Sequence, residues 1–448
     1  MQTRKIFISL PVILILTLIF INGCGSNGST ANITPSSEKA ITAFSIGGAD
    51  GTINETTKTI LVTLPSGTDF TALVGTFTTT GEKVKVGTTA QISGVTANDF
   101  TLPVTYTVTA ADSSTQTYMV IVIEPWKIIS TLNFYSSYSP SRLTLQNGLA
   151  YLADGSIRII DLSTPTAPSV LSTIVGNKSP QLGIFDIMTN VSVSNNKMLV
   201  GAEIGCTGWC SGNQFAGNLY VYDITNPTNP VRTSYLGMGT GDILLDGNIA
   251  YVTKSNTQPQ FNVIDVSVQP QAGILGSANI PAYGRLAKTG NLMFISCGSG
   301  SGFDGLDTVD ITTQVSPSVL HTGSSGWYGV THPPIVLSGN AAYIADKTYG
   351  LRVLDISNPA SPLIVLTISA LSSINDVAVY NGYLYAADGA SGIRVFDITN
   401  PLNPVYTRTI PTTPYAAKLV AVSGGVGVAV LMNTSNDHYF GVFLPQLH

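Results

Sequence analysis

The chain has 448 residues, of which only 10% are charged and 44% are hydrophobic, and its formal net charge is −5. An average soluble protein has about 25% charged residues. No run of Lys and Arg exists that would displace counterions from phosphates, so the composition excludes nucleic acid as a partner. The low charge is typical of exported β-proteins and argues against a helical cytosolic enzyme.

The first 23 residues predict a signal peptide. Arg4 and Lys5 precede an apolar run over residues 6–21, which is too short to span a bilayer comfortably as a mature helix. The run ends in Ile-Asn-Gly-Cys24, which resembles a lipobox. The resemblance implies cleavage before Cys24, lipid on its sulfur and stable anchoring in a membrane. In an organism with two membranes, Gly25 after the cysteine resembles a signal for sorting to the outer one, so the expected location is the cell envelope, at the outer membrane or the cell surface. The alternative is an ordinary signal peptide followed by a chance cysteine.

Two further regions are expected before the main domain. Residues 24–37 are small, polar and without periodicity, which predicts a flexible tether. Residues 38–124 alternate apolar and polar residues in short runs separated by turn residues, which is the pattern of an all-β sandwich. A hairpin is expected across Ala-Asp-Ser-Ser at residues 111–114. The segment resembles the bacterial immunoglobulin-like (Ig-like) modules that serve as spacers on exported proteins.

Residues 126–448 repeat one unit of four short strands. The clearest copies share Ala-Asp, Ile/Leu-Arg and Asp-Ile/Leu-Ser/Thr. The aspartate that begins the last of these motifs is Asp161, Asp355 or Asp397. Such a unit cannot bury both faces alone, whereas stacking around an axis buries them and leaves few edges. The repeat closely resembles the LVIVD repeat family, and the resemblance implies a β-propeller.

The strand count predicts seven blades. The first outer strand, residues 127–132, has no partner strands before it, and the last unit, Val420 to Leu444, lacks an outer strand. We therefore expect the N-terminal strand to pair with the C-terminal blade and close the ring. The expected fold class is all-β, an Ig-like β-sandwich followed by a closed seven-bladed β-propeller.

One aspartate recurs at the end of the third strand in six units. A carboxylate there can accept backbone N–H groups of the following turn, as Asx side chains do. We interpret these residues as turn-formers, because their spread around the ring prevents them from converging on one catalytic or calcium site. They are Asp161, Asp223, Asp265, Asp310, Asp355 and Asp397.

The mouth of the propeller channel is the first candidate ligand site. Alignment on the tyrosines of the second strands places one residue of each first strand near the channel. Two arginines and two acids in this ring could bind a polar ligand, or they could pair only with one another and with water. The seven positions are Arg142, Asn190, Asp242, Arg285, Pro334, Asp376 and Leu419.

Aromatic residues on the same face form the second candidate. The insertion at about 201–217 carries Cys206, Trp209 and Cys210, and a Cys206–Cys210 disulfide is expected in an oxidising compartment. A later loop adds Trp327 and Tyr328. Exposed aromatic residues favour stacking on sugars or contact with proteins, although they could equally cover blade ends as packing. The remaining Cys297 lies in an apolar run and predicts a buried thiol.

The sequence favours a protein without enzymatic activity. It contains no Gly-x-Ser-x-Gly motif, no His in a convincing Ser or Cys setting, and no His/Asp/Glu cluster with metal spacing, so we expect no cofactor and no metal. The leading hypothesis is an envelope lipoprotein whose propeller binds a protein or a glycan. The alternatives are a hydrolase or lyase acting at the channel mouth, and a structural subunit of an envelope assembly.

Overall fold

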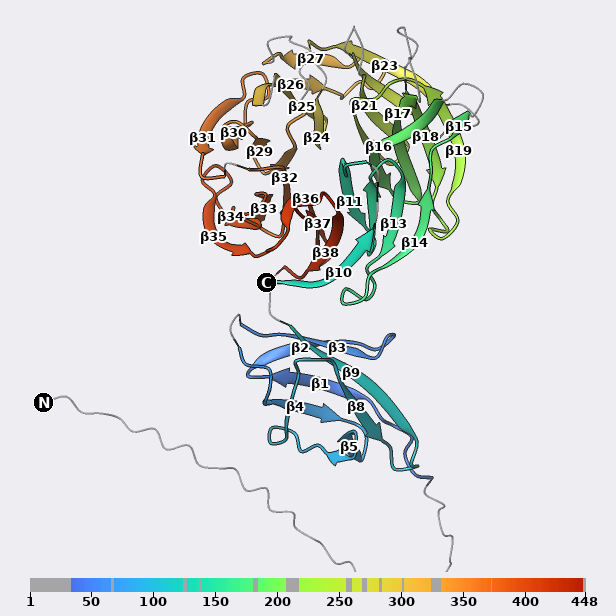
Figure 1. Cartoon of the computed structure of the whole chain (residues 1–448), viewed down its shortest axis with the longest axis vertical. Coiled ribbons are helices and arrows are strands. Elements are labelled where there is room, and N and C mark those ends of the chain that lie inside the picture. Colours follow the sequence, from blue (N-terminus) through green and yellow to red (C-terminus); the bar gives the residue numbers. More distant parts are fainter. Residues whose placement is uncertain are drawn as a thin grey trace, which may run out of the picture.

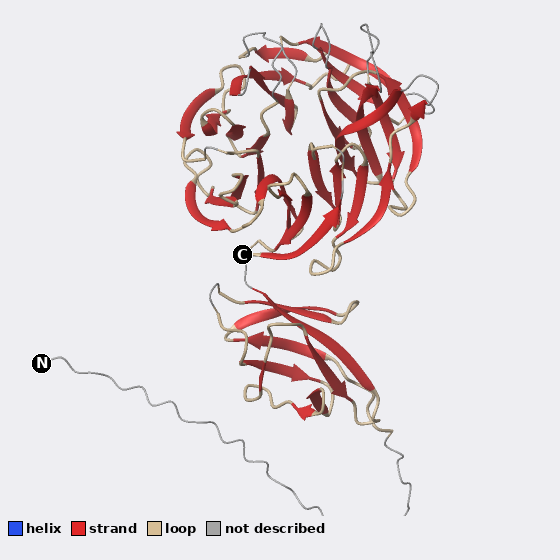
Figure 2. Ribbon diagram, viewed as in Figure 1, coloured by secondary structure: helices blue, strands red, loops and turns tan. Residues whose placement is uncertain are grey.

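The structure is a computed structural model. It describes residues 34–445 except 66–67, 124–126, 135, 137, 180–183, 207–216, 255–259, 268–271, 282–283, 300–301, 324–331 and 372. Every regular element of this part is a β-strand (Figure 2), and it holds no helix of the length and apolarity needed to cross a membrane. The predicted signal peptide and Cys24 lie outside the described residues.

The N-terminal domain contains nine strands. They are β1 (Ile41–Ile46), β2 (Ala49–Asn54), β3 (Thr59–Thr63), β4 (Leu73–Thr79), β5 (Lys83–Val86), β6 (Thr89–Ala90), β7 (Ala97–Asn98), β8 (Val104–Thr109) and β9 (Thr115–Ile123). The hydrogen-bonded order is β6-β5-β8-β9-β3-β2-β1-β4-β7, with β3 and β9 parallel. The predicted hairpin is confirmed, because β8 pairs antiparallel with β9.

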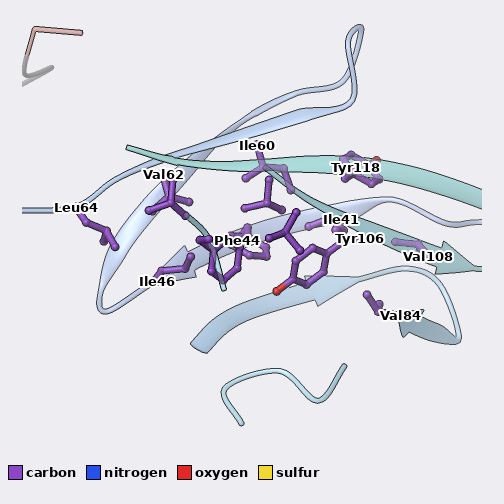
Figure 3. Close-up of a cluster of buried hydrophobic side chains, with 14 residues drawn as sticks. Ile41, Phe44, Ile46, Ile60, Val62, Leu64, Val84, Tyr106, Val108 and Tyr118 are labelled. Atoms are coloured by element: carbon purple, nitrogen blue, oxygen red, sulfur yellow. The ribbon is translucent and has the colours of Figure 1, made fainter. Parts of the chain in front are cut away.

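This sheet curls around a core of alternating inward side chains (Figure 3). Tyr106 and Tyr118 are fully buried, and the Tyr106 ring meets Phe44 edge-on, with 5.3 Å between the ring centroids. Burial of such rings dominates the stability of a small β-domain. The result is a curled half-barrel in one continuous strand order, so the predicted division into an Ig-like sandwich of two sheets is not confirmed.

The second domain is a seven-bladed propeller (Figure 1). Blade one contains β11 (Arg142–Gln146), β12 (Leu149–Ala153), β13 (Ile157–Asp161) and β14 (Ser169–Ile174). Blade two contains β15 (Lys178–Ser179), β16 (Ile184–Ser194), β17 (Lys197–Cys206), β18 (Asn218–Asp223) and β19 (Val231–Gly237). Blade three contains β20 (Asp242–Asp246), β21 (Ile249–Lys254), β22 (Gln260–Asp265) and β23 (Gly273–Asn279). Blade four contains β24 (Arg285–Thr289), β25 (Leu292–Ser299), β26 (Gly302–Asp310) and β27 (Ser318–His321).

Blade five contains β28 (Ile335–Ser338), β29 (Ala341–Asp346), β30 (Gly350–Asp355) and β31 (Leu363–Ile368). Blade six contains β32 (Asp376–Tyr380), β33 (Tyr383–Ala387), β34 (Ile393–Asp397) and β35 (Val405–Ile410). Blade seven contains β36 (Ala416–Ser423), β37 (Val426–Met432) and β38 (His438–Phe443). The strand β10 (Ile128–Phe134) is the outer member of this last sheet, where it pairs antiparallel with β38.

Turn chemistry in the repeat matches the prediction. Asn381 and Gly382 both have positive φ, 48° and 76°, as the tight hairpin turn between β32 and β33 requires. The repeated aspartates form Asx turns, because each carboxylate accepts the backbone N–H of the residue two positions later at 2.8–2.9 Å. Hydrogen bonds from the side chain and from the backbone N–H of that same residue lower the pKa of four of them, and the side-chain bond has the larger effect in all but Asp355: Asp223, Asp265, Asp310 and Asp355.

Candidate site at the mouth of the propeller channel

The four charged residues predicted at the channel mouth occupy equivalent positions in four blades. Arg142, Asp242, Arg285 and Asp376 each begin the first strand of their blade, in β11, β20, β24 and β32. Figure 1 shows β11, β24 and β32 on the inner side of the ring. Their cross-strand partners are Ala153, Thr253, Ser296 and Ala387. Because the blades are arranged in a ring, residues at this position converge on the axis from different directions.

Asp242 is the centre of the cluster. Its side chain is fully buried, and Oδ2 lies 2.8 Å from Nη2 of Arg142. The same oxygen accepts the backbone N–H of Leu286 at 2.8 Å, and Nη1 of Arg285 lies 3.5 Å from Oδ1. A buried carboxylate is stable only when opposite charges and hydrogen bonds compensate its lost hydration. Asp242 therefore requires both arginines.

The two arginines reach across the channel. Arg142 belongs to blade one and its partner Asp242 to blade three, with blade two between them. Nη2 of Arg285, from blade four, donates to the backbone carbonyl of Ser141 in blade one at 3.0 Å. We call the three side chains of Arg142, Asp242 and Arg285 the ion bridge. Burial and the charge of Arg142 lower the pKa of Arg285 to about 10, so Arg285 is still cationic at neutral pH.

Asp376 makes the same inter-blade contact as Asp242 but lacks a direct ion pair among the described residues. Its Oδ2 accepts the backbone N–H of Val420 in blade seven at 3.0 Å, just as Asp242 accepts Leu286 N from the next blade. Burial raises the pKa of Asp376 to about 6, against the opposing effects of this hydrogen bond and of the nearby Arg285 and Arg142. Asp376 therefore titrates close to neutral pH.

The other three predicted positions of the ring carry no charge. Asn190 is buried and its amide lies 3.4 Å from the carbonyl of Gly241 in the next blade. Pro334 accepts Ala345 N at 2.9 Å, and Leu419 is 8% exposed. Asn190 and Leu419 thus contact a neighbouring blade, whereas Pro334 is bonded within blade five. The polar character of the mouth comes from the ion bridge and Asp376.

Arg285 of the ion bridge lines two cavities. The inner one, of about 400 Å³, is lined by Arg142, Arg285 and Asp376 together with apolar residues of the first strands. The outer one, of about 290 Å³, is also lined by Arg285, and we call it the vestibule. Its remaining lining residues are Ser139, Pro140, Ser141, His332, Pro333, Pro334, Ala345, Lys347, Asn375, Lys418 and Leu419.

A second set of ion pairs was missed by the sequence reasoning. The aspartate at the end of the second strand is buried and pairs with an arginine of the third strand in three blades, as Asp154–Arg158 at 2.7 Å, Asp346–Arg352 at 2.9 Å and Asp388–Arg394 at 3.4 Å. The sequence shows this signal as the recurrence of Ala-Asp followed by Ile-Arg or Leu-Arg. These pairs lie inside single blades and stabilise the blade turns.

The aromatic candidates cannot be placed. Trp209, Cys210, Trp327 and Tyr328 lie outside the described residues, and so does the side chain of Cys206, the last residue of β17. Cys297 is a fully buried thiol, as predicted. Within the described part of the chain, no three side chains of His, Cys, Asp or Glu come close enough to hold a metal ion.

Comparison with known families supports both halves of the architecture. Residues 141–175, 334–370 and 372–412 match the family model described as LVIVD repeat. These three segments cover blades one, five and six, so these three blades are LVIVD repeats. All three buried Asp–Arg pairs fall within these matched repeats. Residues 41–122 match a second family model, described as SGBP, N-terminal, where SGBP denotes a surface glycan-binding protein.

Solved structures show the same propeller fold at low sequence identity. The RRP9 WD40 repeats are 11% identical, with a TM-score of 0.53, 71% of this chain covered and 98% of that chain. U3-55K is also 11% identical, with a TM-score of 0.52 and coverage of 71% and 100%. At such identity the similarity concerns the fold alone. No curated protein matches the chain.

Proposed function

We propose that this protein is a lipid-anchored cell-surface protein that binds glycans, with the propeller as the recognition module. The observation that carries the proposal is the match of residues 41–122, almost the whole N-terminal domain, to the N-terminal domain of surface glycan-binding proteins. The same chain adds a propeller with a polar vestibule at its channel mouth. Glycan recognition needs such polar groups in a concave site, together with apolar surface against the sugar faces.

The anchor is proposed from the sequence around Cys24. A lipid on this residue, followed by the tether over residues 24–37, would hold both domains outside the membrane. The test is to express the full chain and the Cys24→Ser variant and to compare their membrane fractions. We expect the full chain to sediment with membranes and the variant to be released. Release of both proteins, or of neither, contradicts lipidation at Cys24.

Glycan binding is tested on a soluble form that lacks residues 1–33, which retains every described strand. This form is screened against an array of envelope and extracellular glycans beside the double variant Trp209→Ala/Trp327→Ala. Capture of a glycan by the wild-type protein supports the function, and its loss in the double variant assigns the contact to the aromatic residues. An array on which no glycan is captured contradicts the proposal.

The described residues support the two alternative functions, an enzyme and an assembly subunit, less well than glycan binding. A hydrolase or lyase at the channel mouth needs converging acids or histidines, but the described mouth pairs its two acids with backbone N–H groups and arginines. An assembly subunit should carry a broad apolar patch on one face. Most of the exposed apolar side chains described in the propeller are instead spread over six outer strands around the rim, for example Val231, Ile274, Leu363 and Val405.

A further inference from the structure

The vestibule above the ion bridge is cationic. Three of its lining side chains, Arg285, Lys347 and Lys418, carry positive charge, and no carboxylate is among the described residues that line it. A cleft lined by one sign of charge between low-dielectric walls concentrates the field and attracts ions of the opposite sign. The vestibule therefore has the electrostatics of an anion site within a protein whose net charge is −5.

The position of Lys418 follows from an irregularity in β36. The register between β36 and β37 shifts between Ala417 and Leu419, so Lys418 is the extra residue of a β-bulge. Bulges redirect a side chain and are over-represented next to functional sites. The amide of Asn375 donates to the carbonyl of Ala417 at 3.1 Å and fixes the start of the bulge to blade six. The Lys418 ammonium is thus brought to the vestibule by a defined backbone feature.

Lys347 approaches the vestibule from a different blade. It lies in the turn between β29 and β30 of blade five, directly after the buried Asp346, whose Oδ1 accepts the N–H of Thr348 at 2.9 Å. Asp346 is itself neutralised by Arg352, so it does not compensate the charge of Lys347. Burial, and the nearby charge of Lys347, lower the pKa of Lys418. In the part of the chain that the structure describes, neither lysine forms an ion pair, and the two ammonium groups are near enough for one to lower the pKa of the other.

The third cation of the vestibule, Arg285, is part of the ion bridge. Asp242 is paired with both Arg142 and Arg285, so two arginines share one carboxylate. The three side chains of the bridge therefore have a net charge of about +1, and the two lysines add to it. Mutual repulsion of the lysines is relieved when an anion lies between them, because each ammonium then gains an opposite charge within a few ångströms.

We propose that the vestibule binds the acidic group of an anionic glycan, a carboxylate or sulfate ester on a sugar, through Lys347 and Lys418. This inference rests on the proposed glycan-binding function and specifies its ligand class. The cavity, about 290 Å³, is at the small end of ligand pockets, which span about 300–1,000 Å³. It therefore accommodates a terminal sugar unit, with the rest of the glycan outside on the propeller face.

The test compares acidic oligosaccharides with neutral counterparts of the same sugar sequence. Probes are a uronic acid trisaccharide with its methyl-esterified form, a sulfated disaccharide with its desulfated form, and inorganic sulfate and the free uronic acid. Binding to the full-length chain in nonionic detergent is measured by calorimetry. The variants are Lys347→Gln/Lys418→Gln and, as the matched control, Lys83→Gln/Lys85→Gln. The control removes two exposed lysines of β5 in the N-terminal domain.

We expect at least one acidic oligosaccharide to bind and its neutral counterpart to bind at least about tenfold more weakly. We also expect the vestibule variant, but not the control, to lose about tenfold in affinity, and the affinity to fall with salt.

Equal binding of the acidic and neutral forms overturns the anion site while the glycan-binding function stands. Acidic binding that survives in the vestibule variant overturns this location. Sulfate or free uronic acid binding as tightly as the oligosaccharides supports the anion site and contradicts the glycan function. Absence of binding to every probe overturns the anion site.

Discussion

Nη2 of Arg142 lies 2.8 Å from Oδ2 of Asp242, although the two residues begin strands of blades one and three. The contact crosses the mouth of the channel, and Arg285 completes it from blade four through the carbonyl of Ser141. The ion bridge thus connects three of the seven blades by direct contact. It contributes to the closure of the ring as well as to the electrostatics of the vestibule.

We predict that Arg142→Met destabilises the propeller by about 2 kcal/mol, because the buried Asp242 loses its shortest charged contact while Arg285 and Leu286 N remain. The measurement is urea unfolding followed by tryptophan fluorescence. The variant Lys85→Met, at an exposed position of β5, is the control and should change stability by less than about 0.5 kcal/mol. A loss no larger than that of the control contradicts the role of the ion bridge in stability.

The raised pKa of Asp376 predicts how the stability of the folded protein changes with pH. Its folded-state pKa is about 6, above the value of about 3.9 in an unfolded chain, so the folded protein binds the proton more tightly. Ionisation therefore opposes folding, and stability contributed by this group falls as the pH rises from about 4 to about 6. We expect Asp376→Asn to gain about 1–2 kcal/mol relative to the wild-type protein between pH 4.5 and pH 7.5.

The measurement for Asp376 is urea unfolding of both proteins at the two pH values. The control is Asp50→Asn, at an exposed position of β2, whose stability difference from the wild-type protein should stay constant. A difference for Asp376→Asn that is also independent of pH would show that this carboxyl does not titrate near neutral pH.

Breaking the buried ion pair of Asp346 and Arg352 is expected to lower the stability more than Arg142→Met does. Asp346 is fully buried, and its Oδ2 lies 2.9 Å from Nε of Arg352. Removing one partner of a buried pair leaves an uncompensated charge, which costs about 3–5 kcal/mol. We expect Arg352→Met to lose about this amount. The double variant Arg352→Met/Asp346→Asn should regain part of it, and failure of this rescue would contradict a charge-based explanation.

Cys297 provides a test of core packing in blade four. Its side chain is fully buried in the apolar core between blades three and four, so a thiol reagent reaches it only after unfolding. We expect iodoacetamide to leave the peptide that contains Cys297 unmodified in the native protein and to modify it fully in 6 M guanidinium. Peptide mass spectrometry distinguishes this residue from the other cysteines. Rapid labelling in the native state would contradict the described packing.

The sequence predicted the repeat, the number of blades and the turn chemistry because these depend on local patterns. The aspartates such as Asp355 sit two residues before the N–H that they bind, and the turn residues Asn381 and Gly382 are adjacent. The alignment on strand tyrosines selected Arg142 and Asp376, and these residues begin the first strands β11 and β32. The sequence did not show which charged side chains form ion pairs, and buried pairs such as Asp346–Arg352 were missed.

By itself, the sequence determined an all-β chain with a seven-fold repeat, since periodicity and turn residues act over a few positions. The tertiary structure decided which charges meet. Arg142 and Asp242 are 100 positions apart, and only the closed ring brings strands of non-adjacent blades to one axis. It also decided the direction of Lys418, because one extra residue in β36 shifts the register without changing the apolar pattern of the strand. Contacts across a ring depend on how all its blades close, and no local pattern records that geometry.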